Sequence, residues 1–490
     1  MSGPLGRRNT KIVATLGPAS SSPASIEELI VAGVNVVRLN FSHGTRAEHG
    51  RVIESVREVS HRLDVAVAIL LDLQGPRIRT GQLKGGQIEL KAGQPVTITA
   101  GEPASETPVI TTTYEDLYRD VAPGDRILMD DGLIEVRVRG VAGTEIECEV
   151  VYGGVLKEHK GMNLPGVSVS APSLSDKDRE DLDFGIDNGV DFIALSFVRK
   201  ASDIFDLRER LKQKNAEIPI IAKIEKAEAI ENLDSILDES EGIMIARGDL
   251  GVELSAEVIP VLQKRLISRA NEAGKVVITA TQMLESMISN PRPTRAEASD
   301  VANAVFDGTD ALMLSGETAV GRYPVKAVEM MSKIAAEAEE AALAQKHFLR
   351  RKKAAAGSFA QAVAFAAHAA GAEVGAKAIV VFTQTGETAQ IISKTRPASP
   401  IVAFTPVEKT WRRMSINWGL QPFLIEFGGY TDEMICRGEA ALLNYGLADF
   451  GDTIVIVSGT KVGMRGATNM MKIDWIGSEE CKLYIKKEEG

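Results

Sequence analysis

Two carboxylates and one ammonium group end neighbouring apolar runs in the middle of the chain, and together they suit a divalent metal ion. The run PIIAKIE ends on Lys223 and Glu225, and the run IMIARGD ends on Asp249. Mg²⁺ typically takes one or two protein carboxylates and completes its shell with water and substrate oxygens. Lys223 stands two residues before Glu225, which puts both side chains on one face of a strand. These residues predict a Mg²⁺ site, which Mn²⁺ can also fill, with a fixed cation beside it.

The lysine and glutamate also have a simpler explanation, in which they only satisfy each other's charge. Three arginines at the same predicted strand ends weaken that explanation, namely Arg38, Arg79 and Arg247. A net-acidic protein has little structural reason to gather cations in one place. Phosphoryl transfer needs such a set, because a divalent ion and fixed cations stabilise the moving group while the protein does little covalent work.

Eight short apolar runs alternate with segments of helical spacing, apart from one long gap, and predict a (β/α)₈ TIM barrel of the α/β class. The runs are 11–16, 34–41, 65–72, 190–198, 219–225, 243–249, 275–282 and 309–317. An open doubly wound sheet is the alternative. The polar residues fall at the C-terminal ends of the runs, which form the catalytic face of a barrel. An open sheet would instead spread them along one edge.

Two other regions differ from the barrel segments in their pattern of apolar and polar residues. Residues 74–171 show alternating strand patterns and predict an inserted β-barrel domain, placed where it can act as a lid over the barrel mouth. Within it, Asp130-Asp131-Gly132 favours a hairpin turn over a direct catalytic role. Residues 1–73 and 172–345 then form the barrel, and 346–490 form a C-terminal α/β domain.

Composition limits the class of protein. The net charge of −11 argues against nucleic-acid or anionic-membrane partners, which need clustered Lys and Arg. The first residues lack a signal-peptide pattern and no run of 18 apolar residues occurs, so we expect a cytoplasmic protein. The three cysteines, Cys148, Cys436 and Cys481, are far apart and are expected to be buried thiols.

Polar residues at other strand ends leave alternatives open. His43 is the one histidine of six near the predicted mouth, and we interpret it as a loop residue or a nucleotide contact rather than a catalytic base. Thr281, Ser315 and Glu317 either orient water for a proton transfer or, for the last two, cap a strand end and a helix start.

Seven separated segments, in order and over essentially the whole chain, resemble the pyruvate kinase family. They are KIVATLGPAS (11–20), NVVRLNFSHG (35–44), LLDLQGPRIRTG (70–81), IAKIEKAEAIENLDSIL (221–237), IMIARGDLGVEL (243–254), ITATQMLESM (278–287) and NPRPTRAEASDVANAVFDGTDALMLSGETAVGRYP (290–324). The resemblance implies transfer of the phosphoryl group of phosphoenolpyruvate to ADP, giving pyruvate and ATP. A barrel lyase acting on phosphoenolpyruvate is the alternative, and only the kinase requires ADP.

The resemblance also implies residue roles. Glu225 and Asp249 look like ligands of the enzyme-bound Mg²⁺, and Lys223 looks like the cation that stabilises the transferring phosphoryl group and the enolate left behind. Arg38 looks like a contact to that phosphoryl group. Nucleotide-side contacts would be His43, Arg79 and Lys177, with a second divalent ion arriving on ADP.

The substrate carboxylate would be bound by backbone amides of Arg247, Gly248 and Asp249, with Thr281 beside them. Only a small residue at position 248 lets the backbone approach a ligand so closely. Arg-Gly-Asp can alternatively be an exposed adhesion tripeptide, although a buried apolar lead-in speaks against it.

The monovalent site of the family would use Asn40, Ser42, Asp72 and the carbonyl of Leu73. K⁺-dependent members carry Glu at the position of Arg77, whereas K⁺-independent members carry Lys. Arg departs from both patterns but keeps the positive charge, so we expect activity without K⁺.

An effector site is implied in the C-terminal domain, where hydroxyls and amides precede a helix and can bind phosphate. Its expected residues are Thr383, Thr385, Gly386 and Thr388, with the Gly-rich segment 458–469 as a second loop. Ordinary helix capping explains the same threonines. The resemblance implies a phosphorylated sugar as activator and a homotetramer.

Overall fold

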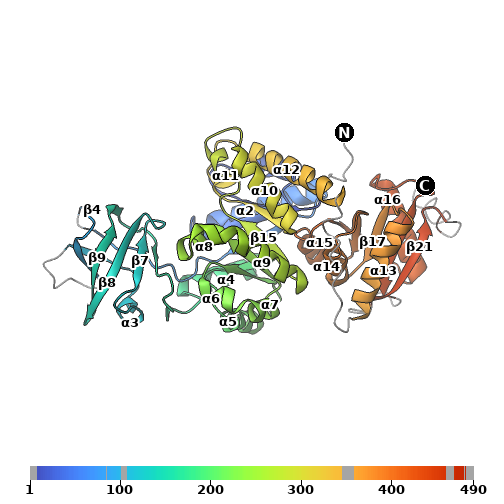
Figure 1. The fold of residues 1–490 in the computed structure, drawn as a ribbon. Coiled ribbons are helices and arrows are strands. Elements are labelled where there is room, and N and C mark those ends of the chain that lie inside the picture. Colours follow the sequence, from blue (N-terminus) through green and yellow to red (C-terminus); the bar gives the residue numbers. More distant parts are fainter. Residues whose placement is uncertain are drawn as a thin grey trace.

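The computed structural model describes residues 8–83, 85–100, 108–344, 358–459, 468–478 and 481 of the 490-residue chain. It has a central barrel, a β-rich insert over one end of the barrel, and a C-terminal α/β domain at the other end (Figure 1). The insert and the C-terminal domain therefore contact opposite ends of the barrel strands.

The central sheet is a closed barrel of parallel strands in the order β1-β16-β15-β14-β13-β12-β3-β2. The strands are β1 (Lys11–Thr15), β2 (Val36–Asn40), β3 (Ala68–Asp72), β12 (Phe192–Leu195), β13 (Ile220–Ile224), β14 (Gly242–Ala246), β15 (Val276–Ala280) and β16 (Ala311–Leu314). Seven of the predicted runs contain one whole strand each, and the run 243–249 overlaps β14, which begins one residue earlier. The (β/α)₈ prediction is confirmed, and the open-sheet alternative is wrong.

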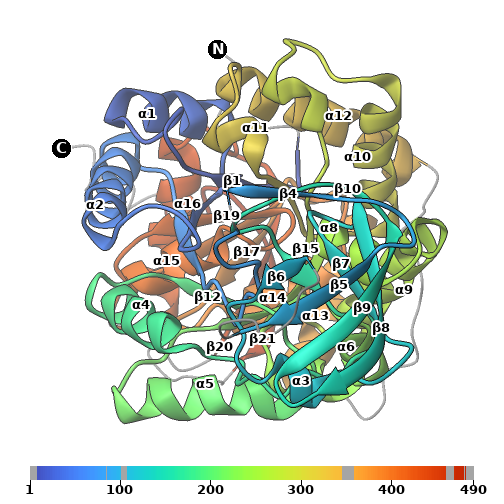
Figure 2. The same cartoon turned by 90° about the vertical axis from the view of Figure 1, so that its left-hand side faces the viewer.

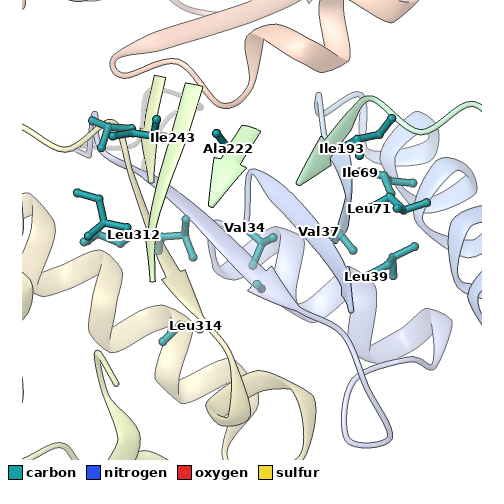
Figure 3. Close-up of a cluster of buried hydrophobic side chains, with 14 of the residues drawn as sticks. Val34, Val37, Leu39, Ile69, Leu71, Ile193, Ala222, Ile243, Leu312 and Leu314 are labelled. Carbon is teal, nitrogen blue, oxygen red and sulfur yellow. The ribbon is translucent and has the colours of Figure 1, made fainter. Parts of the chain in front are cut away.

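Alternate residues of each barrel strand face opposite sides, and both sides are apolar. Leu39, Leu71 and Leu312 belong to the core cluster between the strands and the surrounding helices (Figure 3). Val36 and Leu70 belong to a separate cluster that fills the barrel. Strands of a parallel sheet covered by helices are buried on both faces, which is why they read as nearly continuous apolar runs.

Helices and short helical turns surround the barrel and follow the strands. They are α1 (Pro23–Ala32), α2 (Arg46–Leu63), α4 (Asp176–Asp187), α5 (Ala201–Gln213), α6 (Ala227–Glu231), α7 (Leu233–Glu239), α8 (Arg247–Glu253), η1 (Ala256–Val258), α9 (Ile259–Glu272), η2 (Glu285–Ile288), α10 (Arg295–Asp307), α11 (Gly316–Ala319) and α12 (Pro324–Ala344). Helix α2 starts at a capping box, in which Thr45 and Glu48 each accept the other's backbone N–H. None of the described helices is long and apolar enough to cross a membrane.

The expected β insert is confirmed, and it forms a half-barrel. It has a six-stranded sheet in the order β11-β7-β8-β9-β5-β6 and a two-stranded sheet, β10-β4. Its elements are β4 (Gln87–Leu90), β5 (Pro95–Thr99), β6 (Val109–Thr111), α3 (Leu117–Asp120), β7 (Arg126–Met129), β8 (Ile134–Ala142), β9 (Glu145–Tyr152), β10 (Gly154–Lys157) and β11 (Met162–Asn163). Figure 2 looks onto the insert, with barrel helices visible around it.

The predicted hairpin turn joins β7 to β8. Asp130, Asp131 and Gly132 all have positive φ angles, of 53°, 56° and 85°. Asp and Gly tolerate this left-handed conformation better than most residues. The N–H of Leu133 donates to the carbonyl of Asp130 at 3.1 Å and closes the turn.

The C-terminal domain is a five-stranded sheet in the order β19-β18-β17-β20-β21, in which only β21 is antiparallel to its neighbour. Its elements are α13 (Phe359–Glu373), β17 (Ala378–Phe382), α14 (Glu387–Lys394), β18 (Ile401–Thr405), α15 (Glu408–Met414), β19 (Leu420–Leu424), α16 (Thr431–Asn444), β20 (Thr453–Gly459) and β21 (Thr468–Trp475). The expected α/β domain is confirmed.

This domain covers the N-terminal ends of the barrel strands. Ile416, between α15 and β19, joins the apolar cluster inside the barrel. Lys11, at the start of β1, donates to the carbonyl of Leu420 at 2.7 Å. Arg412 of α15 pairs at 2.9 Å with Asp191, which directly precedes β12. Contacts at this end of a barrel usually serve stability, and the C-terminal ends remain open for chemistry.

The cysteine expectation was wrong for one pair. Cys436 of α16 and Cys481 form a disulfide that spans 45 residues, whereas Cys148 is a buried free thiol, as expected. Disulfides are rare in reducing compartments, and the wide separation of these cysteines in the sequence suggested no pairing. The fold brings the chain after β21 back onto α16, which only the structure shows.

Candidate active site

The polar residues at the barrel mouth continue the inward-facing register of their strands. In β3, Leu70 lies inside the barrel and Asp72 follows two residues later; in β13, Ile221 is followed by Lys223 and then Glu225. Side chains two residues apart point to the same face of a strand. The apolar filling of the barrel is therefore topped by charged groups at its C-terminal end.

Lys223 lies at the centre of this charged layer. Its Nζ is 3.2 Å from Asp72 Oδ1 and 2.9 Å from Glu225 Oε1. It also donates a hydrogen bond of 2.7 Å to the hydroxyl of Ser196. Arg38 pairs with the other oxygen of Asp72 at 2.6 Å. Four strands thus supply one network, as expected for residues gathered at a barrel mouth.

The charges of this network hold one another ionised. Burial lowers the pKa of Lys223, but the carboxylates of Asp72 and Glu225 outweigh it and raise that pKa above its usual value. Burial raises the pKa of Asp72, but Lys223 and Arg38 outweigh it and lower that pKa below its usual value. Lys223 is therefore an ammonium group and Asp72 a carboxylate at neutral pH.

Asp249 does not end a strand, contrary to the expectation. Strand β14 stops at Ala246, and Arg247 starts the short helix α8, so Asp249 lies in the first turn of a helix. Its position next to the other charges is nevertheless as expected. Burial, and then the nearby charge of Glu225, raise the pKa of Asp249 to about 6. Two carboxylates that oppose each other's ionisation in this way are a suitable place for a divalent cation.

The donor set fits Mg²⁺ better than a metal with an all-protein shell. Within the ranges that the structure describes, no group of three or more His, Cys, Asp and Glu side chains is arranged to hold a metal. A cation here would take Glu225 and Asp249 and complete its shell with water or substrate oxygens, which is typical of Mg²⁺. The N–H of Phe197 donates to Glu225 at 2.7 Å and orients that carboxylate.

The loop after β15 packs against the start of α8. The N–H of Gly248 donates to the hydroxyl of Thr281 at 2.8 Å. Arg247 pairs with Asp300 at 2.7 Å and its side chain is only 11% exposed, so the tripeptide is not displayed and the adhesion alternative is wrong. Thr281 and Gln282 both have positive φ, 66° and 53°, as is frequent at functional sites.

Glycine at position 248 is not required by the protein itself. A Cβ built there would lie 3.5 Å from Thr281 Oγ1, which is ordinary van der Waals contact. The need for a small residue at this position therefore stays a prediction about the bound substrate.

The expected nucleotide-side residues lie on the other side of the mouth. Burial and then the charges of Arg77 and Arg79 lower the pKa of His43, so its ring is neutral at pH 7. Lys177 donates to the carbonyl of Phe41 at 2.6 Å, which ties the start of α4 to the loop that contains His43. The structure therefore brings His43 close to these arginines and Lys177 to the same loop.

The residues of the predicted monovalent site are also close together. Asn40 and Asp72 pair across neighbouring strands β2 and β3. The side chain of Asn40 accepts the N–H of Ser42 at 3.1 Å, and the carbonyl of Leu73 accepts the hydroxyl of Ser196 at 2.7 Å.

A cavity of about 710 Å³ lies between the barrel mouth and the insert. Arg77, Asp131 and Asn163 line it from the insert, and Gly248 and Asp249 line it from the barrel. The insert therefore faces the barrel mouth, and its action as a lid stays a prediction. A cavity of this size is within the usual range for small-molecule sites.

Two partners of the charged network were missed in the sequence. Ser196 holds Lys223, and Thr15 accepts a hydrogen bond of 3.0 Å from Arg38. Ser196 directly follows β12 and Thr15 ends β1. The strand-end rule that selected the other residues also points to these two.

Glu317 holds a loop in place. Its carboxylate accepts the N–H of Leu284 at 3.0 Å and that of Ser315 at 2.7 Å, and the residue is fully buried. These contacts favour the structural alternative for Glu317. The hydroxyl of Ser315 is buried and has no hydrogen-bond partner among the described residues.

The predicted effector loop precedes α14. The hydroxyl of Thr383 accepts the N–H of Gly386 at 2.9 Å, and Thr388 contacts the hydroxyl of Thr468. Thr385 accepts the N–H of Glu387 at 3.4 Å. Most of the predicted second loop, residues 460–467, lies outside the described residues.

The fold and the charged mouth define a TIM-barrel enzyme that handles anionic substrates with a divalent cation. Two family models match the chain: "Pyruvate kinase, barrel domain" over residues 7–328 and "Pyruvate kinase, alpha/beta domain" over residues 361–474. The chain belongs to the pyruvate kinase family. It is therefore a phosphotransferase of glycolysis with phosphoenolpyruvate and ADP as substrates, and members of this family generally depend on Mg²⁺.

Individual relatives agree over nearly the whole chain. Pyruvate kinases of Staphylococcus aureus strains MRSA252 and USA300 are each 49% identical over 474 residues, which cover 96% of this chain and 81% of theirs. A crystal structure of a pyruvate kinase from Cryptosporidium parvum superposes with a TM-score of 0.90 at 40% identity, covering 96% of this chain and 97% of that one.

Proposed function

We propose that Glu225 and Asp249 hold the Mg²⁺ with which this enzyme transfers the phosphoryl group of phosphoenolpyruvate to ADP. The observation that carries the proposal is the raised pKa of Asp249, about 6, beside Glu225 and the ammonium group of Lys223. When bound, the cation neutralises phosphate and enolate oxygens as charge moves between them. The two carboxylates then lose the mutual repulsion that opposes their ionisation.

Lys223 is proposed as the fixed charge at the reacting group. Its ammonium group is held by Asp72, Glu225 and Ser196, so no reorganisation is needed as negative charge develops on the enolate oxygen. Arg38 is proposed as a second cation on the transferring phosphoryl group. Its pairing with Asp72 holds the guanidinium in place.

Substrate and nucleotide are proposed to occupy two sides of the barrel mouth. The amides of Arg247, Gly248 and Asp249, with the hydroxyl of Thr281, would bind the substrate carboxylate, because α8 starts there and Gly248 already contacts Thr281. On the other side, the proposed contacts to ADP and its own divalent ion are His43, Arg79 and Lys177.

Activity without K⁺ is proposed because Arg77 lines the cavity. Its charge adds to burial in lowering the pKa of His43, and it opposes the rise that burial and Glu225 cause in the pKa of Asp249. A guanidinium so placed supplies positive charge near the monovalent site formed by Asn40, Ser42, Asp72 and Leu73.

Regulation and assembly are proposed from the C-terminal domain. The loop of Thr383 to Thr388 is the proposed site for a phosphorylated sugar. Ser458, one residue before the end of β20 and the first residue of the predicted second loop, has a buried hydroxyl that is unpartnered among the described residues. A homotetramer is supported by the edge strand β21, on which Ile473 and Trp475 are 47% and 67% exposed. Measuring the substrate saturation curve with and without sugar phosphates tests the activator.

The domain borders at 73/74, 171/172 and 345/346 also remain a proposal, supported by separate apolar clusters in barrel, insert and C-terminal domain. A cytoplasmic location is proposed for an enzyme of glycolysis.

The decisive test of the proposed reaction is pyruvate formation from phosphoenolpyruvate with Mg²⁺, with and without ADP. Pyruvate and ATP should form in equal amounts and only with ADP, whereas carbon–carbon bond chemistry without ADP would support the lyase alternative.

A further inference from the structure

Helix α8 ends on a buried acid that pairs with a lysine of the neighbouring strand end. Glu253 is the last residue of α8 and is 8% exposed. Lys226, which directly follows Glu225, is 9% exposed and donates to the carboxylate of Glu253. The pair therefore links the ends of β13 and α8, the two elements that carry the proposed metal ligands.

The same carboxylate is also contacted from the insert. Burial raises the pKa of Glu253, and Lys226 and the side chain of Asn163, both beside that carboxylate, oppose the rise. Asn163 ends β11, the last strand of the insert, so it lies where the chain leaves the insert and returns to the barrel. Glu253 thus joins one group of the barrel to one group of the insert.

The insert also approaches helix α8 with its turn between β7 and β8. A Cβ built on Gly132 in this turn would lie 3.8 Å from the side chain of Val252, which is adjacent to Glu253. Asp131 of the turn and Val252 line the same cavity. The turn and the final strand of the insert therefore both lie near the C-terminal end of α8.

The returning linker is tied to the barrel further along by Arg199. This side chain donates to the carbonyls of Val169 and Ala171, the latter at 2.9 Å. Asn232 donates a hydrogen bond of 3.0 Å to the carbonyl of Arg199 and so holds the backbone of Arg199 in place. Residues 163–171 are therefore anchored at both ends, by Glu253 and by Arg199.

We propose that the Lys226–Glu253 pair, through Asn163, is a positioning device that sets the insert over the active-site cavity. A buried ion pair adds little net stability compared with apolar residues, but it specifies one arrangement strongly because an unpaired partner is costly. Lys226 and Asn163 both line the cavity, so their linkage forms part of its wall. The inference rests on the proposed function only for the identity of the ligands that α8 binds.

The device predicts a particular kinetic signature. If the insert lies over the cavity less often, a smaller fraction of the enzyme is able to bind its substrates. The apparent affinities for phosphoenolpyruvate and ADP then fall in proportion to that fraction, while the turnover at saturating substrate is kept. Lys226→Met, Glu253→Gln and Asn163→Ala should each raise KM for ADP and phosphoenolpyruvate by about tenfold, with a smaller effect on kcat. Lys226→Arg should restore most of the loss. Lys214→Met, which breaks the pair between Lys214, directly after α5, and Asp183 of α4, is the matched control and should change neither constant.

The proposal is tested by hydrogen exchange of the amides of residues 163–171, without metal or substrate, in the full-length enzyme. Exchange should be faster in all three variants than in the wild type and in Lys214→Met. Because no ligand is present, a wrong assignment of the metal ligands leaves this result unaffected. The double variant Lys226→Met/Glu253→Gln removes both charges, so it stays folded if a single variant does not, and it should show the same fast exchange.

Two outcomes would overturn the proposal. Unchanged exchange in residues 163–171 together with wild-type KM values would show that the pair positions nothing. A kinetic loss confined to Lys226→Met, with normal Glu253→Gln and Asn163→Ala, would make Lys226 a direct ligand contact instead. Losses in the three single variants that are far from additive in the double variant support one connected unit.

Discussion

Asp72 and Lys223 meet across the barrel mouth although β12 lies between their strands, with 3.2 Å from Asp72 Oδ1 to Lys223 Nζ. Side chains of next-nearest strands reach each other in this way because both point into a closed ring. Arg38 holds the other oxygen of Asp72. The position of Lys223 is thus determined by two strands besides its own, through Asp72 and Ser196.

Lys223→Met should lower kcat by about 10²–10³-fold, the usual cost of removing one preorganised charge at a transition state. The protein should stay folded, because Asp72 keeps its pairing with Arg38. Turnover is measured at saturating substrates, and circular dichroism reports folding. The exposed Lys214→Met is the control, and turnover equal to that of this control would contradict the proposed role.

Asp249→Asn should raise the Mg²⁺ concentration needed for half-maximal rate and also slow the reaction. Loss of an outer-shell partner alone typically costs about 10–100-fold in metal affinity, so loss of a ligand should cost at least about tenfold. The rate is measured against Mg²⁺ at fixed substrates.

The control for this variant is Asp131→Asn, which changes an aspartate of the insert turn that lines the same cavity. It should leave the Mg²⁺ requirement unchanged if Asp131 only shapes the turn. A shared shift in both variants would indicate a general charge effect and contradict a ligand role for Asp249.

Wild-type enzyme should be active in buffer free of K⁺ and NH₄⁺, and KCl should activate it by less than about tenfold, which corresponds to ~1.4 kcal/mol. Arg77→Glu replaces the guanidinium by the residue found in K⁺-dependent relatives and should make activity depend on KCl. Arg77→Lys keeps the charge and should behave as the wild type. Stronger activation of the wild type by KCl would show that Arg77 does not replace the ion.

Glu439→Gln should stabilise the protein more at pH 8 than at pH 5. Burial raises the pKa of Glu439 from 4.5 to about 7, and one carboxylate oxygen has no partner among the described residues. Between these pKa values the folded protein holds a proton that the unfolded chain releases, so stability falls as pH rises towards 7 and the full cost remains above it. Glutamine carries no such cost and still accepts the N–H of Gly477.

Thermal unfolding of wild type and Glu439→Gln at both pH values measures this difference. Glu426→Gln, at an exposed position before α16, serves as control and should shift the unfolding temperature equally at both pH values. An equal shift for Glu439→Gln would contradict the buried, protonated state of this residue.

The eight barrel strands were predictable because strands buried on both faces form continuous apolar runs, and their C-terminal ends marked Arg38, Asp72, Lys223 and Glu225. The same rule misplaced Asp249 by extending β14 three residues too far, since Arg-Gly-Asp carries no helix-start signal.

Contacts between segments far apart in the sequence could not be predicted from the sequence patterns. Lys226 and Glu253 lie 27 residues apart, and no local periodicity indicates that they form a buried ion pair. The pairing of Cys436 with Cys481 depends on the return of the chain after β21. In each case the three-dimensional path of the chain, rather than the residue type, makes the contact.

Ile416 of the C-terminal domain closes the N-terminal end of the barrel interior. This one side chain from the C-terminal domain completes the apolar filling beneath Val13, Val36 and their neighbours. A shortened protein ending after α12 would leave this end of the barrel interior open to water and would leave Asp191 with Arg57 but without Arg412. Catalytic and C-terminal parts are therefore expected to melt in one cooperative transition, and fragments of this enzyme are poor substitutes for the whole.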